Sequence, residues 1–330
     1  MDTPAMTPLL QVRGLGIRIG EAAPVDGVSF DVMASEMLGI VGESGSGKSL
    51  TLRALLQLLP AHAGVSGQAL WQGRDLLGLD EPGIRAIRGR EIAMIYQEPM
   101  TALDPVLPIG LQITESLQVH LGLLGAVARR RAIELLDLVG IPDAKRRLDN
   151  YPHEFSGGMR QRAMIAIALA AEPRLLLADE PTTALDVTIQ DQILTLLLRL
   201  KDELQMSVIL VTHDLGIVAG TCDRVAVMYA GRIMESGPVH AVFTRPAHAY
   251  TLGLMRSVPT RAQARQRLAF IPGAPPDPNG MPSGCRFAPR CGFATEACTV
   301  APPALAEIGM AHRSACLHAD AVAQAGLAAA

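Results

Sequence analysis

The chain has 330 residues, carries a formal net charge of −3 and is 49% hydrophobic, which is enough apolar material for one large domain or two. Neither this charge nor the 3% aromatic content is typical of nucleic-acid binding, so we expect no nucleic-acid partner. The sequence contains no apolar run of about 18 residues, so we expect no membrane-spanning helix. The first residues lack the features of a secretory signal. We therefore expect a cytosolic protein that can dock on a membrane through a partner.

The N-terminal part of the chain is predicted to be rich in β-strands. Apolar and polar residues alternate in short segments, which is the pattern of half-buried strands, and these segments are residues 9–12, 17–19 and 28–32. A further pair of strands is expected within residues 64–79. Together the segments indicate a region of strands and turns around the first long apolar run of the chain.

Residues 42–49 match the motif G-x-x-x-x-G-K-[ST], between an apolar run that predicts a buried strand and a helical pattern over 50–59. In this context backbone N–H groups and the helix N-terminus hold phosphates. Lys48 is expected to reach the β- and γ-phosphates of a nucleotide, and the Ser49 hydroxyl to bind Mg²⁺. The predicted nucleotide-binding residues of this loop are Gly42, Glu43, Ser44, Gly45, Ser46, Gly47, Lys48 and Ser49.

The middle of the chain is predicted to be mostly helical. Residues 91–96 form an expected strand, after which the apolar spacing is helical from 109 to about 148 and again over 157–171. This pattern indicates a helical insert, about residues 98–165, within an α/β chain. The later elements expected from the same patterns are a helix at 188–204 and strands at 174–180, 207–212, 224–228 and 231–235.

The strand predicted at 174–180 ends in two carboxylates, Asp179 and Glu180. In a chain that has a phosphate loop, an acid at a strand end is well placed to bind Mg²⁺, so we expect Asp179 to hold the ion together with Ser49. Glu180 is then the natural group to orient and polarise an attacking water. The amide of Gln97, just past another strand, could contact both the ion and the water.

His213 closes the strand predicted at 207–212. Its imidazole can donate a hydrogen bond to a phosphate oxygen, so one hypothesis is that it senses the γ-phosphate. The other hypothesis is a surface histidine, which the local sequence alone favours.

Ser156, Gly157 and Gly158 open a predicted helix and make a second possible anion cradle. One nucleotide does not need two such cradles from the same molecule. We therefore expect two chains to pair head to tail, with each ATP between residues 42–49 of one chain and residues 156–158 of the other. A flexible glycine hinge is the alternative interpretation.

In combination, these motifs resemble those of ATP-binding cassette (ABC) ATPases. The resemblance identifies residues 42–49 as the Walker A loop, Gln97 as the Q-loop glutamine, Asp179 and Glu180 as the end of Walker B, and His213 as the switch histidine. It also assigns the signature to Phe155, Ser156, Gly157, Gly158 and Met159, and the D-loop to Ala184, Leu185 and Asp186. Catalytic roles for Glu180, His213 and Gln97 follow from the same resemblance.

The resemblance implies an α/β P-loop NTPase with a RecA-like core, an antiparallel β subdomain and a helical insert, over residues 1–245. After about residue 245 prolines crowd the chain, which predicts a loop-rich C-terminal extension over 246–330, with a frayed tail at 319–330. Ile19 stands where the family usually places an aromatic residue that stacks on adenine. We therefore expect phosphate and Mg²⁺ contacts to carry more of the nucleotide affinity than the base does.

Residues 96–105 and 151–162 resemble the ATPases of oligopeptide and dipeptide importers, and residues 248–251, 271–273 and 284–291 resemble their C-terminal extension. This implies ATP hydrolysis that drives peptide import at the cytoplasmic face of the plasma membrane. The implied partners are a second ATPase subunit (the same chain or a paralogue), two membrane permeases and an extracytoplasmic solute-binding protein. The alternatives are a nickel or glutathione importer and, from a different class, a soluble cassette ATPase in DNA repair or translation.

Four of the five cysteines lie near the C-terminus, at Cys285, Cys291, Cys298 and Cys316. No C-x-x-C pair occurs, which weakens a zinc-ribbon interpretation, whereas four thiolates on loops suit an iron–sulfur cluster. The importer resemblance implies a [4Fe–4S] cluster at these four residues. Zinc, with His312 or His318 as a further ligand, and free thiols remain alternatives. Cys222 is expected to be a small buried apolar residue.

Overall fold

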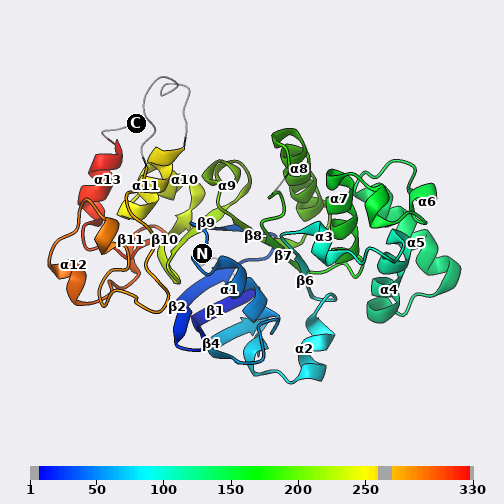
Figure 1. The fold of residues 1–330 in the computed structure, drawn as a ribbon, viewed down its shortest axis with the longest axis horizontal. Helices are drawn as coiled ribbons and strands as arrows, with labels where there is room; N and C mark the ends of the chain where they lie inside the picture. Colours follow the sequence, from blue (N-terminus) through cyan, green and yellow to red (C-terminus); the bar gives the residue numbers. More distant parts are fainter. Residues whose placement is uncertain (1–6, 184, 259–269, 328–330) are drawn as a thin grey trace, which may run out of the picture. The chain divides into compact units, whose positions relative to one another are not determined.

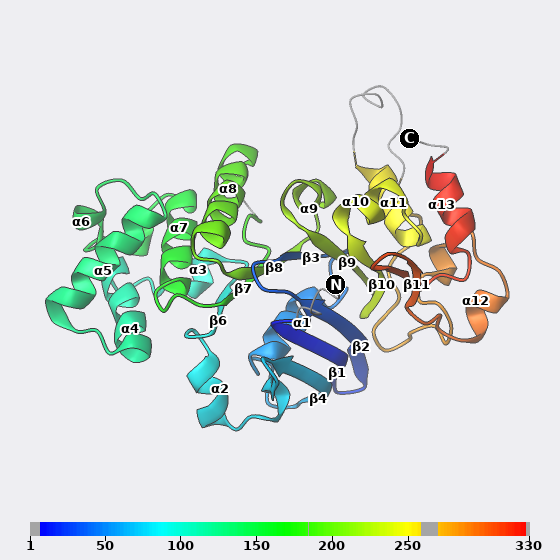
Figure 2. The same cartoon turned by 180° about the vertical axis from the view of Figure 1, so that it is seen from behind.

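The structure is a computed structural model that describes residues 7–183, 185–258 and 270–327. The chain divides into two compact units. The first contains residues up to 33, residues 37–78 and residues from 212 onward, and the second contains residues 34–36 and 79–211. Figures 1 and 2 show the ribbon from opposite sides. Within the described parts of the chain, we find no helix of the length and apolarity that a membrane span requires.

The first unit contains an antiparallel sheet with the strand order β2-β1-β4-β5. Its strands are β1 (Leu10–Ile19), β2 (Ala22–Val32), β4 (Ala63–Trp71) and β5 (Arg74–Asp75). The sequence predicted shorter strands, because the register of β1 against β2 shifts between Val12 and Leu15. Such an irregularity interrupts the alternation of apolar residues without ending the strand.

A second sheet of the first unit has the order β11-β12-β10-β9-β3. Its strands are β3 (Met37–Val41), β9 (Arg224–Tyr229), β10 (Arg232–Pro238), β11 (Ala306–Gly309) and β12 (His312–Ser314). β3 and β9 are parallel, whereas β10 is antiparallel to both β9 and β12. Every residue of β3 is buried, as expected for a strand covered on both faces. The C-terminal part of the chain therefore adds strands to the sheet that carries the phosphate loop.

Several helices of the first unit, α10 to α13, come from the C-terminal part of the chain (Figure 1). The helices of the first unit are α1 (Lys48–Leu55), η1 (Leu76–Gly78), α9 (Leu215–Thr221), α10 (Val239–Thr244), α11 (Ala249–Ser257), η4 (Ala288–Arg290), α12 (Ala297–Val300) and α13 (Ala319–Leu327). The prediction of a frayed tail from residue 319 was wrong for α13, which lies beside α11 in both views. Val322 and Ala323 are buried on one face of α13.

The second unit contains a short parallel sheet with the order β8-β7-β6, and all of its strand residues are buried. These strands are β6 (Ile92–Ile95), β7 (Leu175–Asp179) and β8 (Ser207–Thr212). The helices are α2 (Glu81–Ile87), α3 (Pro99–Ala102), α4 (Ile109–Leu121), α5 (Gly125–Leu138), α6 (Ala144–Arg147), η2 (Pro152–Glu154), α7 (Gly157–Ala168) and α8 (Val187–Glu203). The segment 109–148, which the sequence predicted to be helical, contains the three helices α4, α5 and α6. The first of them ends at Gly122, whose backbone has the left-handed conformation.

Candidate nucleotide site

The phosphate loop runs from the end of β3 to the start of α1 in the first unit. Two of its glycines are required by close backbone approaches. A Cβ atom at Gly42 would overlap the carbonyl oxygen of Met228, and a Cβ at Gly47 would lie 2.7 Å from the carbonyl oxygen of Pro24. Gly47 also has a φ of +98°, which other residues rarely adopt. The loop can therefore keep this shape only with glycine at both positions.

Lys48 is buried at the first turn of α1. Its ammonium group donates hydrogen bonds to the carbonyl oxygens of Gly42 (2.8 Å) and Glu43 (3.0 Å). Ser44 and Gly45 are exposed at the tip of the loop, whereas Ser46 is buried and Ser49 is half-buried. A fixed cation beside a helix N-terminus provides the electrostatics that a phosphate group requires.

The acidic residues predicted at the end of a strand lie in the second unit. Asp179 is fully buried as the last residue of β7, and Glu180 follows with a φ of +46°. The Glu180 N–H donates to the carbonyl oxygen of Val211 (3.0 Å), which fixes this uncommon left-handed conformation.

Two side chains donate to the same oxygen of the Glu180 carboxylate. Gln97 donates from Nε2 to Oε2 over 3.3 Å, and Thr183 donates from Oγ1 to Oε2 over 2.8 Å. The structure thus brings together Gln97 and Glu180, which the sequence had singled out separately. Thr183 was missed by sequence reasoning, although its position three residues after Glu180 within one turn is a local signal.

The predicted signature opens α7 in the second unit. Ser156 is exposed and caps the helix, since its Oγ accepts a hydrogen bond from the N–H of Met159 (3.4 Å). Gly157 is exposed, and a Cβ at Gly158 would lie 2.9 Å from a methyl carbon of Ile189. The start of α7 therefore packs against the first turn of α8.

The predicted D-loop aspartate caps α8. Oδ1 of Asp186 accepts a hydrogen bond from the N–H of Ile189 (2.9 Å). Ala184 lies outside the described residues. Two helix starts capped by polar side chains, those of α7 and α8, thus lie next to each other in this unit.

His213 and Ile19 belong to the first unit. His213 is exposed just after β8. The next residue, Asp214, caps α9, since its Oδ1 accepts a hydrogen bond from the N–H of Gly216 (2.7 Å). Ile19 is half-buried at the end of β1, where it pairs with Ala22 of β2. The first unit therefore contains the phosphate loop, Ile19 and His213, and the second contains Gln97, Glu180 and the signature.

The four C-terminal cysteines gather in the first unit around a core of aromatic and aliphatic residues. Cys285 and Cys298 are buried, and the N–H of Cys285 donates to the carbonyl oxygen of Cys298 (2.8 Å). Burial raises the pKa of Cys285, Cys291 and Cys316, and the neighbouring cysteines raise these pKa values further. These raised pKa values favour the neutral thiols over the thiolates.

No group of three or more His, Cys, Asp or Glu side chains in the described ranges has the arrangement needed to hold a metal ion. The predicted [4Fe–4S] cluster therefore has no support in this structure, although the four cysteines do converge. The zinc alternative gains none either, because the ring Nε2 of His312 contacts Glu235 (2.8 Å) and the ring Nε2 of His318 contacts Thr295 (3.0 Å). The backbone N–H of His318, rather than its ring, reaches a thiol, that of Cys316 (3.4 Å). Cys222 is half-buried and packs against the same apolar core.

The raised pKa values predict that these thiols react slowly in the folded protein. At pH 7.5 the thiolate fraction of Cys285, Cys291 and Cys316 is lower than in the unfolded chain, so we expect alkylation by iodoacetamide to be slower in the folded protein. The rates should converge as the pH rises through the folded pKa values. Mass spectrometry of each cysteine measures this, with the urea-unfolded chain as the control, and equal rates at pH 7.5 would contradict it.

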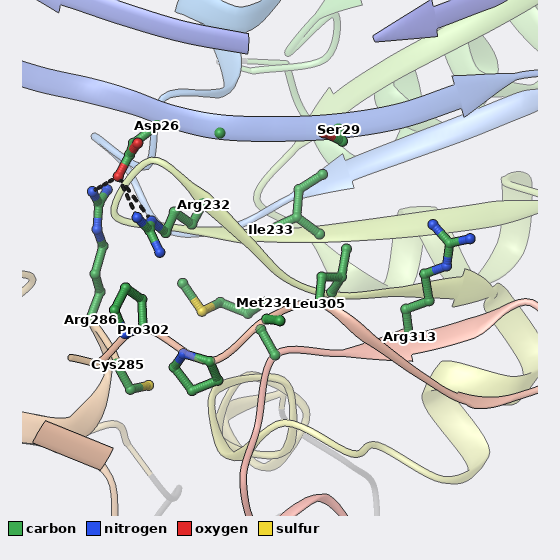
Figure 3. A pocket seen from close by; sticks show the side chains of 14 residues that line it. Asp26, Ser29, Arg232, Ile233, Met234, Cys285, Arg286, Pro302, Leu305 and Arg313 are labelled. Carbon is green, nitrogen blue, oxygen red and sulfur yellow. Dashed lines mark hydrogen bonds and ion pairs between the residues drawn. The ribbon is translucent and has the colours of Figure 1, made fainter. Parts of the chain in front are cut away.

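A cavity of about 420 Å³ lies between β2, β10 and the C-terminal part of the first unit (Figure 3). At its edge the carboxylate of Asp26 accepts hydrogen bonds from both Arg232 (2.7 Å) and Arg286 (2.5 Å). The side chain of Arg286 is buried, and Cys285 beside it also lines the cavity. This ion pair ties the C-terminal extension to the antiparallel sheet, and sequence reasoning did not predict it.

A phosphate loop between a buried strand and a helix, with an acidic strand end in an α/β fold, defines a P-loop nucleoside triphosphatase. The family described as "ABC transporter" matches residues 25–183, and the family described as "Oligopeptide/dipeptide transporter, C-terminal region" matches residues 234–298. The chain belongs to the ABC transporter family and is an ATPase of that family. The predicted family, fold class and enzyme class are therefore confirmed.

Individual relatives cover most of the chain. It is 50% identical over 301 residues to the "Oligopeptide transport ATP-binding protein OppD" of Haemophilus influenzae, over 90% of this chain and 93% of that one. It is 52% identical over 328 residues to a "Probable peptide ABC transporter ATP-binding protein" of Sinorhizobium fredii, over 97% and 98% of the two chains. A solved dimeric ATP-binding cassette bound to ADP and phosphate is similar with a TM-score of 0.62 and 27% identity, covering 70% of this chain and 98% of that one.

Proposed function

We propose that this chain is the ATP-hydrolysing subunit of an importer of oligopeptides or dipeptides. The observation that carries the proposal is the C-terminal extension, because its match to the oligopeptide/dipeptide transporter region adds substrate information to the cassette. The names of the two relatives described above also refer to peptide transport. Nickel and glutathione importers, and soluble cassette ATPases, are less favoured by the same comparisons.

In the proposed site, residues 42–49 cradle the phosphates of ATP and Ile19 contacts the adenine. The buried carboxylate of Asp179, the hydroxyl of Ser49 and the amide of Gln97 are the groups suited to Mg²⁺, since hard oxygen ligands fit this ion. When bound, Mg²⁺ would neutralise part of the charge on the phosphates. These residues bind and orient the nucleotide.

Glu180 is the proposed general base. Its carboxylate would accept a proton from the attacking water and is oriented by the hydrogen bonds from Gln97 and Thr183. His213, exposed at the end of β8, is proposed to donate a hydrogen bond to the γ-phosphate.

We propose that two such subunits, identical or paralogous, hold each ATP between the phosphate loop of one chain and the signature of the other. Ser156, Gly157, Gly158 and Met159 would face the nucleotide bound by the phosphate loop of the partner, with Asp186 beside them. The exposure of Ser156 and Gly157 at a helix N-terminus supports this role. The dimeric cassette bound to ADP and phosphate is a precedent for such an arrangement.

The proposed division of labour assigns residues 1–245 to the nucleotide-binding domain, with a helical subdomain at about 98–165, and 246–330 to the extension. The helical subdomain would contact two permease subunits at the cytoplasmic face of the inner membrane. An extracytoplasmic solute-binding protein would supply the peptide.

The experiment that tests the function is reconstitution of the complete importer in liposomes. We expect a peptide-loaded binding protein to raise ATP hydrolysis several-fold, because substrate delivery closes the two ATPase subunits on ATP. Labelled peptide should accumulate only when ATP is on the side of this chain. Binding proteins loaded with nickel or glutathione are the controls, and transport of either in place of peptides would overturn the assignment.

A further inference from the structure

The phosphate-loop residue Glu43 has each of its polar groups engaged within the first unit. Its carbonyl oxygen accepts hydrogen bonds from Nζ of Lys48 (3.0 Å) and the N–H of Ser46 (3.2 Å). Its own N–H donates to the hydroxyl oxygen of Tyr250 (2.8 Å), and its carboxylate accepts from Arg290. The last two partners belong to the C-terminal extension, which therefore holds the loop from outside the motif.

Arg290 and Glu43 form an ion pair with two parallel hydrogen bonds, from Nη1 to Oε2 (2.7 Å) and from Nη2 to Oε1 (3.1 Å). Only 5% of the Arg290 side chain is exposed. The guanidinium group also lies over the rings of Tyr229 and Phe287, with its carbon 5.7 and 5.9 Å from their centres. The hydrogen bond to Glu43 is the main cause that raises the pKa of Arg290. The guanidinium is therefore a fixed cation against the loop.

Tyr250 provides the second contact, from the first turn of α11. Burial raises the pKa of its hydroxyl, which remains a neutral hydrogen-bond acceptor for the N–H of Glu43. Its own N–H donates to Nδ1 of His248 (3.1 Å). Burial lowers the pKa of His248 to about 4, so that ring is neutral and able to accept. The contact between α11 and the loop is thus independent of pH near neutrality.

We propose that Arg290 is a positioning residue for ATP binding, which neutralises Glu43 and holds the phosphate loop in its binding shape. The proposal rests on the proposed role of residues 42–49 in binding ATP. A triphosphate brings several negative charges to this loop, and an unpaired carboxylate at its second residue would repel them. A bidentate guanidinium removes that repulsion and also restrains the Glu43 side chain. The extension is then part of the nucleotide site of the first unit.

The test is the Arg290→Gln variant of the full-length chain, titrated with MgATP by calorimetry. We expect the Kd for ATP to rise about tenfold, within the usual range for coupling between sites, and the KM of the reconstituted importer to rise similarly while kcat changes less than about twofold. The double variant Arg290→Gln with Glu43→Gln should recover most of the affinity, because it leaves no unpaired carboxylate. A structural role of Arg290 alone would not predict that recovery.

The matched control is Arg286→Gln, which removes another buried, ion-paired arginine of the same extension. Its partner Asp26 lies in β2 and not in the phosphate loop. We expect this control to lower the thermal unfolding midpoint, followed by the fluorescence of the single tryptophan Trp71, without changing the Kd for ATP more than about twofold. If it weakens ATP binding as much as Arg290→Gln does, general loosening explains the effect and the proposal is wrong.

Two further outcomes separate this inference from the proposed function. An unchanged Kd in Arg290→Gln, with normal ATP binding by the wild-type chain, would overturn the positioning role alone. Failure of the wild-type chain to bind ATP would instead overturn the assignment of residues 42–49. If the double variant binds ATP no more tightly than Arg290→Gln does, the role of Arg290 in neutralising Glu43 is also contradicted.

Discussion

The Glu180→Gln variant is expected to hydrolyse ATP at steady state about 10²–10⁴-fold more slowly than the wild-type chain, since an amide cannot accept the proton of the attacking water. Glutamine has the same shape as glutamate, and its amide oxygen can still accept hydrogen bonds from Gln97 and Thr183. The local geometry should therefore persist. Phosphate release measures the rate, and calorimetry should show that the Kd for ATP stays within about twofold of the wild-type value.

The control for this variant is Glu172→Gln. Glu172 is an exposed carboxylate of the same unit that pairs with Arg131 on the surface (2.7 Å), so its loss should leave turnover unchanged. If Glu180→Gln hydrolyses ATP at the wild-type rate, the assignment of Glu180 as the general base is wrong. Loss of ATP binding in the same variant would instead point to a structural role for the carboxylate.

The Glu235→Ala variant is expected to lower the free energy of unfolding of the first unit by about 3 kcal/mol or more, because each buried polar group left without a partner costs about 1–3 kcal/mol. Glu235 is fully buried in β10. Its carboxylate accepts hydrogen bonds from the backbone N–H groups of Ala247 (2.7 Å) and His248 (3.0 Å). It also contacts Nε2 of His312 (2.8 Å). Removing the carboxylate leaves all three groups buried without an acceptor.

Urea unfolding followed by Trp71 fluorescence measures this loss, because Trp71 is the only tryptophan and is buried in β4. The control is Glu307→Ala, since Glu307 is exposed on β11 of the same sheet. Its effect on the free energy of unfolding should be within about 0.5 kcal/mol. A similarly small effect of Glu235→Ala would show that water or a rearranged side chain replaces the carboxylate.

The sequence predicts the parts of the site whose residues are close together along the chain. The phosphate loop was recognisable because residues 42–49 contain every fixed position of its motif, and Glu180 because it directly follows a buried apolar strand. The hydrogen bond between Gln97 and Glu180 joins residues 83 positions apart. Each residue could be proposed separately, but their contact depends on the parallel pairing of β6 with β7.

The C-terminal extension was the least predictable part. Its prolines indicate loops correctly, but they give no signal for the two-residue pairing of β12 with β10. The ion pair of Arg290 with Glu43 joins residues 247 positions apart, and no local pattern marks either side chain as a partner of the other. Four cysteines close together and the family resemblance suggested a metal site, but neither fixes how the sulfur atoms are arranged.

The position of β11 and β12 in the sheet also bears on solubility. Without these strands, β10 would present an open edge whose N–H and C=O groups can pair with a strand of another chain. The strand that ends the sheet on this side is β11, which has only four residues, all exposed, and carries the charged Glu307. Short, charged edge strands resist such pairing. Proteolytic loss of the extension would therefore uncover an aggregation-prone edge in the remaining cassette.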